Sequence, residues 1–324
     1  MEHAQLQWTD VTARPGKLTG RLATLKRLLQ ASTYVRPGTK PIGWVRVATL
    51  FLRCTAHLDT FRNWFGNPRH AALQEALVRR PTLVNCVVHP YLNANWSASR
   101  KLDVIAGHYA MLDGRLGFLR FAASEVVELG CTDEGLHIRL DKPASYEHEG
   151  EVNISLFSGD SRLYSLVFTL SQQGKRRVAY VGALQGLHSD DALEIYRGLT
   201  HRMFGLRPRD LLLDAFRMLC VELGVTRILA ISNAGRVSSN AYFSSSTQVY
   251  SSYDSAWLDA HAVAAEENFF ELSPVRIDRT NDDIPTRKRA QYRRRYAMLD
   301  ALHERISQAV QAASTADLRR RENA

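Results

Sequence analysis

The chain has 324 residues, of which 45% are hydrophobic and 23% are charged, so it can bury one large core or two smaller ones without disulfides. Its four cysteines form no C-x-x-C pair and lie at no metal-ligand spacing from a histidine, which argues against a disulfide framework and predicts no bound metal. The net charge of +9 favours an anionic partner, such as nucleic acid, an anionic membrane surface or a phosphorylated ligand.

The positive charge is concentrated at the two ends of the chain. Residues 11–62 contain ten Lys or Arg and one acid, Asp59, and residues 275–324 contain twelve bases and seven acids. The first ten residues, MEHAQLQWTD, carry no apolar signal segment, and the apolar run WVRVATLFL is interrupted by Arg46 and is too short to span a bilayer. We therefore expect a cytoplasmic protein, at most peripheral at the inner membrane.

The N-terminal third has helical periodicity. In GKLTGRLATLKRLLQ, the residues Leu18, Leu22, Leu25 and Leu29 share one predicted helix face. Further helices are predicted over Trp44 to Trp64, over HAALQEALVRR, and over Ser97 to Leu112. This part of the chain is therefore expected to be mainly helical.

The period changes in the middle of the chain. LHIRL, EVNISLF, RLYSLVFTL and RRVAYVGAL are short, rich in β-formers and separated by turn residues, which predicts an antiparallel meander from Leu136 to Leu184. A helix beginning at Pro208 and a buried strand from Val225 to Ile231 follow. The order predicts an α+β fold, with a basic, mainly helical region over residues 1–130 and an α+β domain with a long C-terminal helix over residues 131–324.

The C-terminal helix begins with a basic run. Six of the nine residues from Arg287 to Arg295 are cationic, and Thr286 is the predicted N-cap. An advance of about 100° per residue places Arg287 and Arg294 in solvent and places Lys288 and Arg295 on the apolar stripe. The apolar stripe consists of Tyr292, Tyr296, Leu299, Leu302, Ile306 and Val310. Lys288 and Arg295 are therefore predicted to be partly buried and to meet carboxylates or a bound anion, whereas a nucleic-acid arm would use all six bases alike.

Several enzyme classes lose their support. The chain has no G-x-S-x-G elbow, no Walker loop and no G-x-G-x-x-G after a strand. Serine hydrolases, P-loop NTPases and dinucleotide-binding enzymes are thereby disfavoured.

Five segments together resemble the VirK/YbjX family, a bacterial family catalogued as a domain of unknown function, DUF535. They are HPYLNANWSASRKLDVIAGHYAML, GALQG, LTHRMFGLRPRDLLLDAF, YDSAW and IPTRKRAQYRRRYAMLD. The resemblance as a whole runs from about the 40s to about residue 310. The resemblance implies a link to virulence, envelope stress and resistance to antimicrobial peptides, without an established reaction.

A second resemblance concerns the fold. Four strands, then Gly-x-x-Pro opening a helix, then ELGVTRILAI, are similar to the core of the GNAT superfamily of N-acetyltransferases. In that fold, the strand before the helix splays from the next strand, the pantetheine arm of the acyl donor pairs with the exposed strand edge, and amides at the helix start hold the pyrophosphate. The resemblance implies a GNAT-like mixed sheet and acyl-CoA or an acyl carrier protein as co-substrate.

The GNAT loop signature has a partial match at Arg202 and Gly205, where Arg207 replaces the small final residue. With Arg209, these residues are candidates for binding the donor's phosphates. The alternative is that the arginines are exposed or pair with Asp210 and Asp214. Gly182 and Gln185 are further candidates for donor contact, and the alternative is that the glycines of VGALQG mark a bulge and a turn.

The acyltransferase reading also assigns catalytic candidates. Asn233 follows a buried strand and would orient the acceptor amine or a water, while Tyr250 or Tyr253 would protonate the leaving thiolate. The alternative is a turn-capping asparagine and core tyrosines.

The leading hypothesis is a GNAT-like acyltransferase that acts on an amine or hydroxyl acceptor, with an envelope lipid or lipopolysaccharide precursor as the acceptor that the family resemblance suggests. The other hypothesis is a non-enzymatic virulence or stress factor whose basic surfaces bind nucleic acid or an anionic membrane.

Overall fold

A computed structural model of the chain describes most of its residues. The described residues are 20–33, 41–66, 73, 76–77, 80, 82–112, 116–119, 126–142, 144–240, 243, 252–280 and 282–322. They divide into two compact units, Met1–Tyr91 with Trp96–Asp113, and Leu92–Asn95 with Gly114–Ala324.

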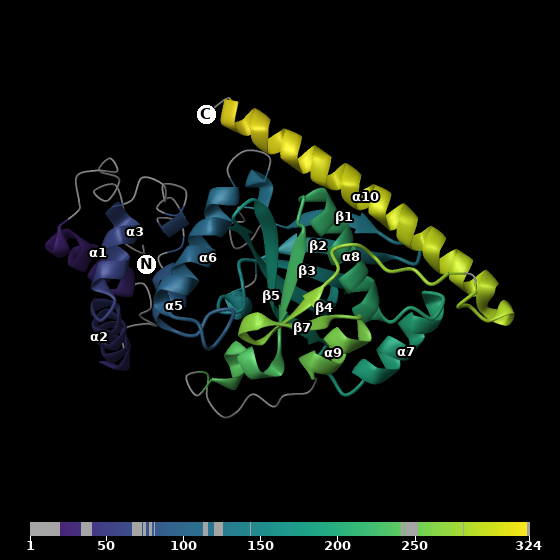
Figure 1. The fold of residues 1–324 in the computed structure, drawn as a ribbon, viewed down its shortest axis with the longest axis horizontal. Helices are drawn as coiled ribbons and strands as arrows, with labels where there is room; N and C mark the ends of the chain where they lie inside the picture. The colour runs from purple at the N-terminus through teal and green to yellow at the C-terminus, as the bar shows by residue number, and fades with distance from the viewer. Residues whose placement is uncertain are drawn as a thin grey trace. The chain divides into compact units, whose positions relative to one another are not determined.

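The first unit is helical. Its described helices are α1 (Arg21–Thr33), α2 (Pro41–Thr55), α3 (Leu58–Gly66), α5 (Leu83–Val88) and α6 (Ala98–Met111). α1, α2 and α3 pack on one another (Figure 1). The single helix predicted over Trp44 to Trp64 is in fact two helices, and the predicted helix over Ser97 to Leu112 is confirmed as α6, with Ser97 as its N-cap.

The predicted apolar face of α1 is wrong. Its buried residues are Thr24, Leu28, Ala31 and Ser32. Leu22 and Leu29 are 83% and 49% exposed. The hydroxyls of Thr24 and Ser32 donate to backbone carbonyls four residues earlier, so they enter the core with their hydrogen bonds satisfied.

The second unit is built on one mixed sheet with strand order β1-β2-β3-β4-β5-β6-β8-β7 among the described residues. The strands are β1 (Val127–Cys131), β2 (Leu136–Asp141), β3 (Val152–Ser158), β4 (Ser161–Gln173), β5 (Arg176–Gly186), β6 (Arg227–Ile231), β7 (Val263–Ala265) and β8 (Phe269–Leu272). The predicted meander is confirmed as the antiparallel ladder β2 to β5. β1 begins at Val127, four residues before residue 131, the predicted start of this domain.

One parallel pair interrupts the antiparallel sheet. β5 and β6 pair in parallel, and α7 (Ala192–Arg202) and α8 (Pro208–Glu222) connect them. β6 then pairs antiparallel with β8, which carries β7 at its outer edge. The predicted helix at Pro208 and the strand ending at Ile231 are confirmed.

α8 packs on the sheet. It contacts β3 and β4, and the ring of Phe216 lies 5.0 Å from that of Phe168 in β4. Ten of its fifteen residues are buried, because its other side is also covered by α10 (Arg289–Glu322). α9 (Tyr253–Asp259) follows β6 and contacts β8.

α10 is the predicted long C-terminal helix, and Figure 1 shows it running past α8 and β1. Its predicted stripe is confirmed at Leu299, Leu302, Ile306 and Val310, which are at most 5% exposed. The predicted cap is wrong, because Thr286 lies inside a 3₁₀ turn, Thr286–Lys288, that precedes α10, and the N-cap position of that turn is Pro285.

Candidate functional site

The parallel strands β5 and β6 separate after Val181 and Ala230, the last paired residues of their ladder. β5 continues to Gly186 along β4, so its other edge is free of β6 over this stretch. Gly182 is the extra residue of a bulge, since Val181 pairs with Phe168 and Ala183 with Val167. The strand separation implied by the GNAT resemblance is therefore present in the backbone pairing.

A glycine is required at position 182 because the backbone of Glu149 packs directly against it. A Cβ at this position would lie 1.9 Å from the carbonyl oxygen of Glu149, which no side chain tolerates. Gly182 therefore fits the structural explanation, a glycine that marks a bulge, which was the alternative to a contact with the acyl donor. They also hold Glu149 beside the point where the strands separate.

Asn233 is used to position the start of α9. Its backbone N–H donates to Asp254 Oδ1 at 2.8 Å, its Nδ2 donates to Ser252 Oγ at 2.9 Å, and its Oδ1 accepts from the Tyr253 N–H at 2.9 Å. All three contacts are local to α9 and its N-cap. The geometry therefore favours the capping alternative for Asn233 over a direct contact with a reacting group.

Tyr253 lies at the separation itself and is 2% exposed. Burial raises the pKa of its phenol, and the Arg236 guanidinium, 3.7 Å from the ring centroid, opposes that shift. Hydrogen bonds from the backbone of Leu184 and the side chain of Gln185 also lower this pKa, as bonds donated to the phenol oxygen do. The phenol proton therefore remains available for donation.

Glu149 is a titratable group that sequence reasoning missed. Burial raises the pKa of its carboxyl to about 7, and Arg236 partly offsets the shift. A carboxyl with this pKa can accept or donate a proton near neutral pH. Nothing in SYEHEGEVN singles out Glu149 among its acidic neighbours, because its burial depends on contacts with β5 and Arg236, which are far away in sequence.

Backbone N–H groups of the loop before α8 already have hydrogen-bond partners within the protein. The Gly205 and Leu206 N–H groups donate to Thr200 and Met203 carbonyls at 2.8 and 2.9 Å. Gly205 has φ +78°, and a Cβ there would lie 2.8 Å from Gln291 Nε2. Two amides of the expected pyrophosphate loop are therefore already bonded, and the side of Gly205 is covered by α10.

The three arginines near this loop have protein partners. Arg202 donates to the carbonyl of Glu134, and Arg207, 61% exposed, lies 3.4 Å from Asp259 Oδ2. Arg209 bonds Asp210 at 3.1 Å and Asp259 at 2.9 Å, and its hydrogen bond lowers the pKa of Asp259. The predicted pairing with Asp210 is present, whereas Asp214 pairs with Arg217.

Arg295 and Lys288 behave differently from each other. Arg295 is partly buried as predicted, with its guanidinium 2.8 Å from the Phe204 carbonyl oxygen and 4.3 Å from the Tyr292 ring centroid. Its partner is a carbonyl rather than a carboxylate. Lys288 is exposed, so the prediction that it is partly buried is wrong.

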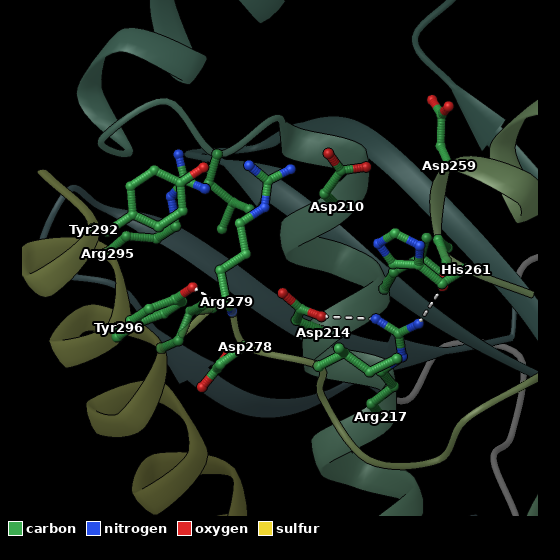
Figure 2. A pocket seen from close by; sticks show the side chains of 15 residues that line it. Asp210, Asp214, Arg217, Asp259, His261, Asp278, Arg279, Tyr292, Arg295 and Tyr296 are labelled. Carbon is green, nitrogen blue, oxygen red and sulfur yellow. Dashed lines mark hydrogen bonds and ion pairs between the residues drawn. The ribbon is translucent and has the colours of Figure 1, made fainter. Parts of the chain in front are cut away.

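A cavity of about 180 Å³ lies between α8 and the start of α10, and Arg279, Tyr292, Arg295 and His261 are among the residues that line it (Figure 2). The lining carboxylates are neutralised by arginines, in the pairs Asp210–Arg209, Asp214–Arg217, Asp259–Arg209 and Asp278–Arg276. Within the described part of the chain, the Arg279 guanidinium has no hydrogen bond or ion pair of its own. A single unengaged cation is weak support for a phosphate site, so the strand separation remains the better candidate for chemistry.

The two remaining predictions about the site concern Tyr250 and a bound metal. Tyr250 lies outside the described residues. Among those that are described, no group of three or more His, Cys, Asp or Glu is placed to hold a metal ion.

Comparison with known proteins gives a family. The model of a protein family of unknown function, DUF535, matches residues 43–308. The chain belongs to the DUF535 family. This confirms the VirK/YbjX resemblance, and the family description carries no activity.

The curated relatives are also uncharacterised. The chain is 28% identical over 255 residues to the uncharacterized protein YbjX of Escherichia coli K12, covering 75% of this chain and 77% of the relative. Two uncharacterized proteins of Haemophilus influenzae are 31% identical over 219 residues and 25% identical over 229 residues, covering 67% and 69% of this chain and 73% and 76% of the relatives. No solved structure matches the chain.

Proposed function

We propose that the protein is an acyltransferase that takes its acyl group from acyl-CoA or an acyl carrier protein and works at the separation of β5 and β6. The observation that supports this most is the position of Glu149 and Tyr253, two proton-transfer groups with raised pKa values, at the edge that β5 leaves unpaired with β6. A free strand edge offers backbone hydrogen bonds to an extended amide-containing arm such as pantetheine.

The proposed reaction divides the proton transfers between the two residues. The acceptor's amine or hydroxyl attacks the thioester carbonyl, the new C–N or C–O bond forms, and the C–S bond breaks. The Glu149 carboxylate takes the proton from the attacking group, and Tyr253 gives its phenol proton to the leaving thiolate. Arg236, which stacks on the Tyr253 ring, stabilises the negative charge that this leaves on the phenol oxygen.

The donor's phosphates would meet Arg202, the last residue of α7, and Arg207, the residue before α8. Arg207 is the more available of the two, since its side chain is 61% exposed and its contacts with Asp210 and Asp259 are long, at 3.6 and 3.4 Å. Amides and cations at a helix start favour an anion. An envelope lipid or lipopolysaccharide precursor is the proposed acceptor class, a step that rests on the family resemblance.

Donor binding is tested by thermal unfolding with CoA, acetyl-CoA and a long-chain acyl-CoA. A donor at about 100 times its Kd should add roughly 2.7 kcal/mol to the free energy of unfolding. Arg202→Ala with Arg207→Ala should lose this shift. The matched control is Arg176→Ala with Arg197→Ala, two exposed arginines on β5 and α7, which should keep it.

Chemistry is tested separately, by release of free thiol from the donor in the presence of amine and lipid acceptors. Tyr253→Phe should keep the donor-induced shift and lose turnover. If none of the CoA species shifts the unfolding of the wild type, and mass spectrometry of the purified protein finds no phosphopantetheine species, the acyltransferase proposal fails.

A further inference from the structure

Helix α2 in the first unit has two apolar faces. One face is buried and consists of Gly43, Val47, Leu50 and Cys54, which pack within the helical unit. This face accounts for the packing of α2 and leaves its opposite side to be explained.

The opposite side of α2 is also apolar, and its larger side chains are more than half exposed. Trp44, Val45 and Leu52 are 52%, 63% and 66% exposed, and Ala48 lies exposed among them. An advance of about 100° per residue places these four side chains within one arc of about 100°, facing away from the buried face. A surface helix of a soluble domain ordinarily has polar residues there, so an exposed apolar arc indicates an interaction surface.

The charges on α2 itself have one sign. α2 contains Arg46 and Arg53 and no acid. Helix α1, which packs on α2, exposes Arg21 and Lys26 together with the apolar Leu22 and Leu29. Positive charge next to exposed leucine, valine and tryptophan is the composition of helices that lie in the interface of an anionic bilayer.

We infer that the outer face of α2, formed by Trp44, Val45, Ala48 and Leu52 with Arg46 beside it, docks on an anionic lipid surface. The apolar side chains enter the boundary between headgroups and acyl chains, and the bases contact lipid phosphates. The fifteen residues of α2 are fewer than the roughly 20 needed to cross a bilayer. Among the described helices, none is long and apolar enough to span a membrane, so α2 would lie along the surface.

A lipid surface fits better than the alternative anion, a nucleic acid. Lys and Arg side chains bind a phosphate backbone, and an exposed arc of Leu, Val and Ala adds nothing to that binding. An aromatic platform for bases would need more than the single Trp44 on this face. The inference does not depend on the acyltransferase proposal, because α2 contributes no residue to the site at β5 and β6.

The test is flotation of the full chain with vesicles of phosphatidylcholine, with and without phosphatidylglycerol. The wild type should bind the vesicles that contain phosphatidylglycerol. Trp44→Ser with Leu52→Ser should bind them about tenfold more weakly or worse, because two large side chains no longer leave water. The matched control is Leu258→Ser with Val275→Ser, which are 59% and 60% exposed in the second unit and should change nothing.

A second measurement reports the position of Trp44. Brominated phosphatidylglycerol should quench part of the tryptophan fluorescence of the wild type, and Trp44→Phe should keep binding while losing that part. Thermal melts check that each variant is folded, as expected for exposed positions. The inference is overturned by equal binding of all variants, by no binding to either vesicle, or by duplex DNA binding that displaces vesicles and ignores the Trp44 and Leu52 substitutions.

Discussion

At the scale of single residues, Glu149 has the property that most affects stability as pH changes. Its carboxyl has an ordinary pKa of 4.5 and a folded-state pKa of about 7, chiefly because of burial. Between these two values the unfolded chain has lost the proton and the folded chain keeps it. The folded state therefore loses stability as pH rises from 4.5 to 7, and above pH 7 the loss is complete.

Glu149→Gln removes this titration, since the amide stays neutral. The free energy of unfolding of the variant, minus that of the wild type, should increase from pH 4.5 to pH 7 by an amount on the order of 3 kcal/mol and then level off. Urea unfolding at a series of pH values measures it. The exposed Glu194→Gln on α7 is the control. A difference that does not vary with pH would show that the Glu149 pKa is ordinary in the folded protein.

Tyr253 could be named as a candidate from the sequence, whereas Glu149 could not. Tyr253 stands in YDSAW, a segment that the family resemblance marks. Glu149 stands among Glu147 and Glu151, and Lys142 pairs with Glu151 at 2.5 Å. Which of three nearby acids is buried deeply enough to have a raised pKa depends on tertiary contacts, so composition and spacing give no means of choosing.

At the scale of elements, the start of α10 separates the bases that the sequence groups together. Arg295 holds the Phe204 carbonyl, and Phe204 has φ +51°, a left-handed conformation that costs energy for a residue with a side chain. Arg287 and Arg294 are exposed. The run therefore contains both structural and solvated bases.

Arg295→Gln should lower the free energy of unfolding by about 1–3 kcal/mol, since it removes a charged hydrogen bond and the contact with the Tyr292 ring. Arg287→Gln with Arg294→Gln should change it by less than about 0.5 kcal/mol. Chemical denaturation of both variants makes the comparison. Equal effects of the two variants would contradict the structural role of Arg295.

Lys288 shows where helical periodicity stops being informative. Counting at about 100° per residue is valid only inside an α-helix, and the backbone over Thr286–Lys288 is a 3₁₀ turn, which advances about 120° per residue. The stripe from Leu299 to Val310 could be predicted because it lies wholly within α10. In α1 the error had another cause, since two hydroxyl side chains bond the helix's own carbonyls and enter the core.

At the scale of the whole molecule, a short segment of the chain interrupts the division into two units. Leu92–Asn95 belongs to the second unit although the residues on both sides belong to the first. The Leu92 N–H donates to the His148 carbonyl and the Ala94 N–H to the Gly235 carbonyl, while Asn93 Nδ2 donates to the Glu267 carbonyl at 2.6 Å. This segment therefore holds together three loops of the second unit.

Asn93→Ala should lower the free energy of unfolding of the second unit by about 1–3 kcal/mol, because Asn93 is 1% exposed and the substitution leaves the Glu267 carbonyl and the Asn95 N–H without this partner. Asn95→Ala is the matched control, since the Asn95 bond to Asn93 comes from its backbone and its side chain is exposed. Urea unfolding of both variants measures the difference. An Asn93→Ala midpoint equal to that of the control would sink this assignment.

The α+β class, the meander and the helix at Pro208 could be predicted because each rests on a local period or a local signal. The outer strands β7 and β8 could not be predicted, because they are three and four residues long and their pairing is decided by β6, far away in sequence. For Arg207 and Arg209 the sequence predicted one carboxylate partner, Asp210, and missed the other, Asp259, which is also far away in sequence. Asp210 is adjacent in sequence, whereas Asp259 is brought to them by α9.

The contact between α10 and β1 has a consequence for the order of folding. From β1 to β5 each strand pairs with the next one along the chain, so these ladders close short loops and can form early. Arg305 of α10 bonds Asp133, a residue 172 positions earlier, so docking of α10 closes a long loop and pays its entropy last. A chain caught before that step carries the apolar stripe of Leu299, Leu302 and Ile306 in solvent. That intermediate, rather than the native state, should be the species that aggregates during refolding.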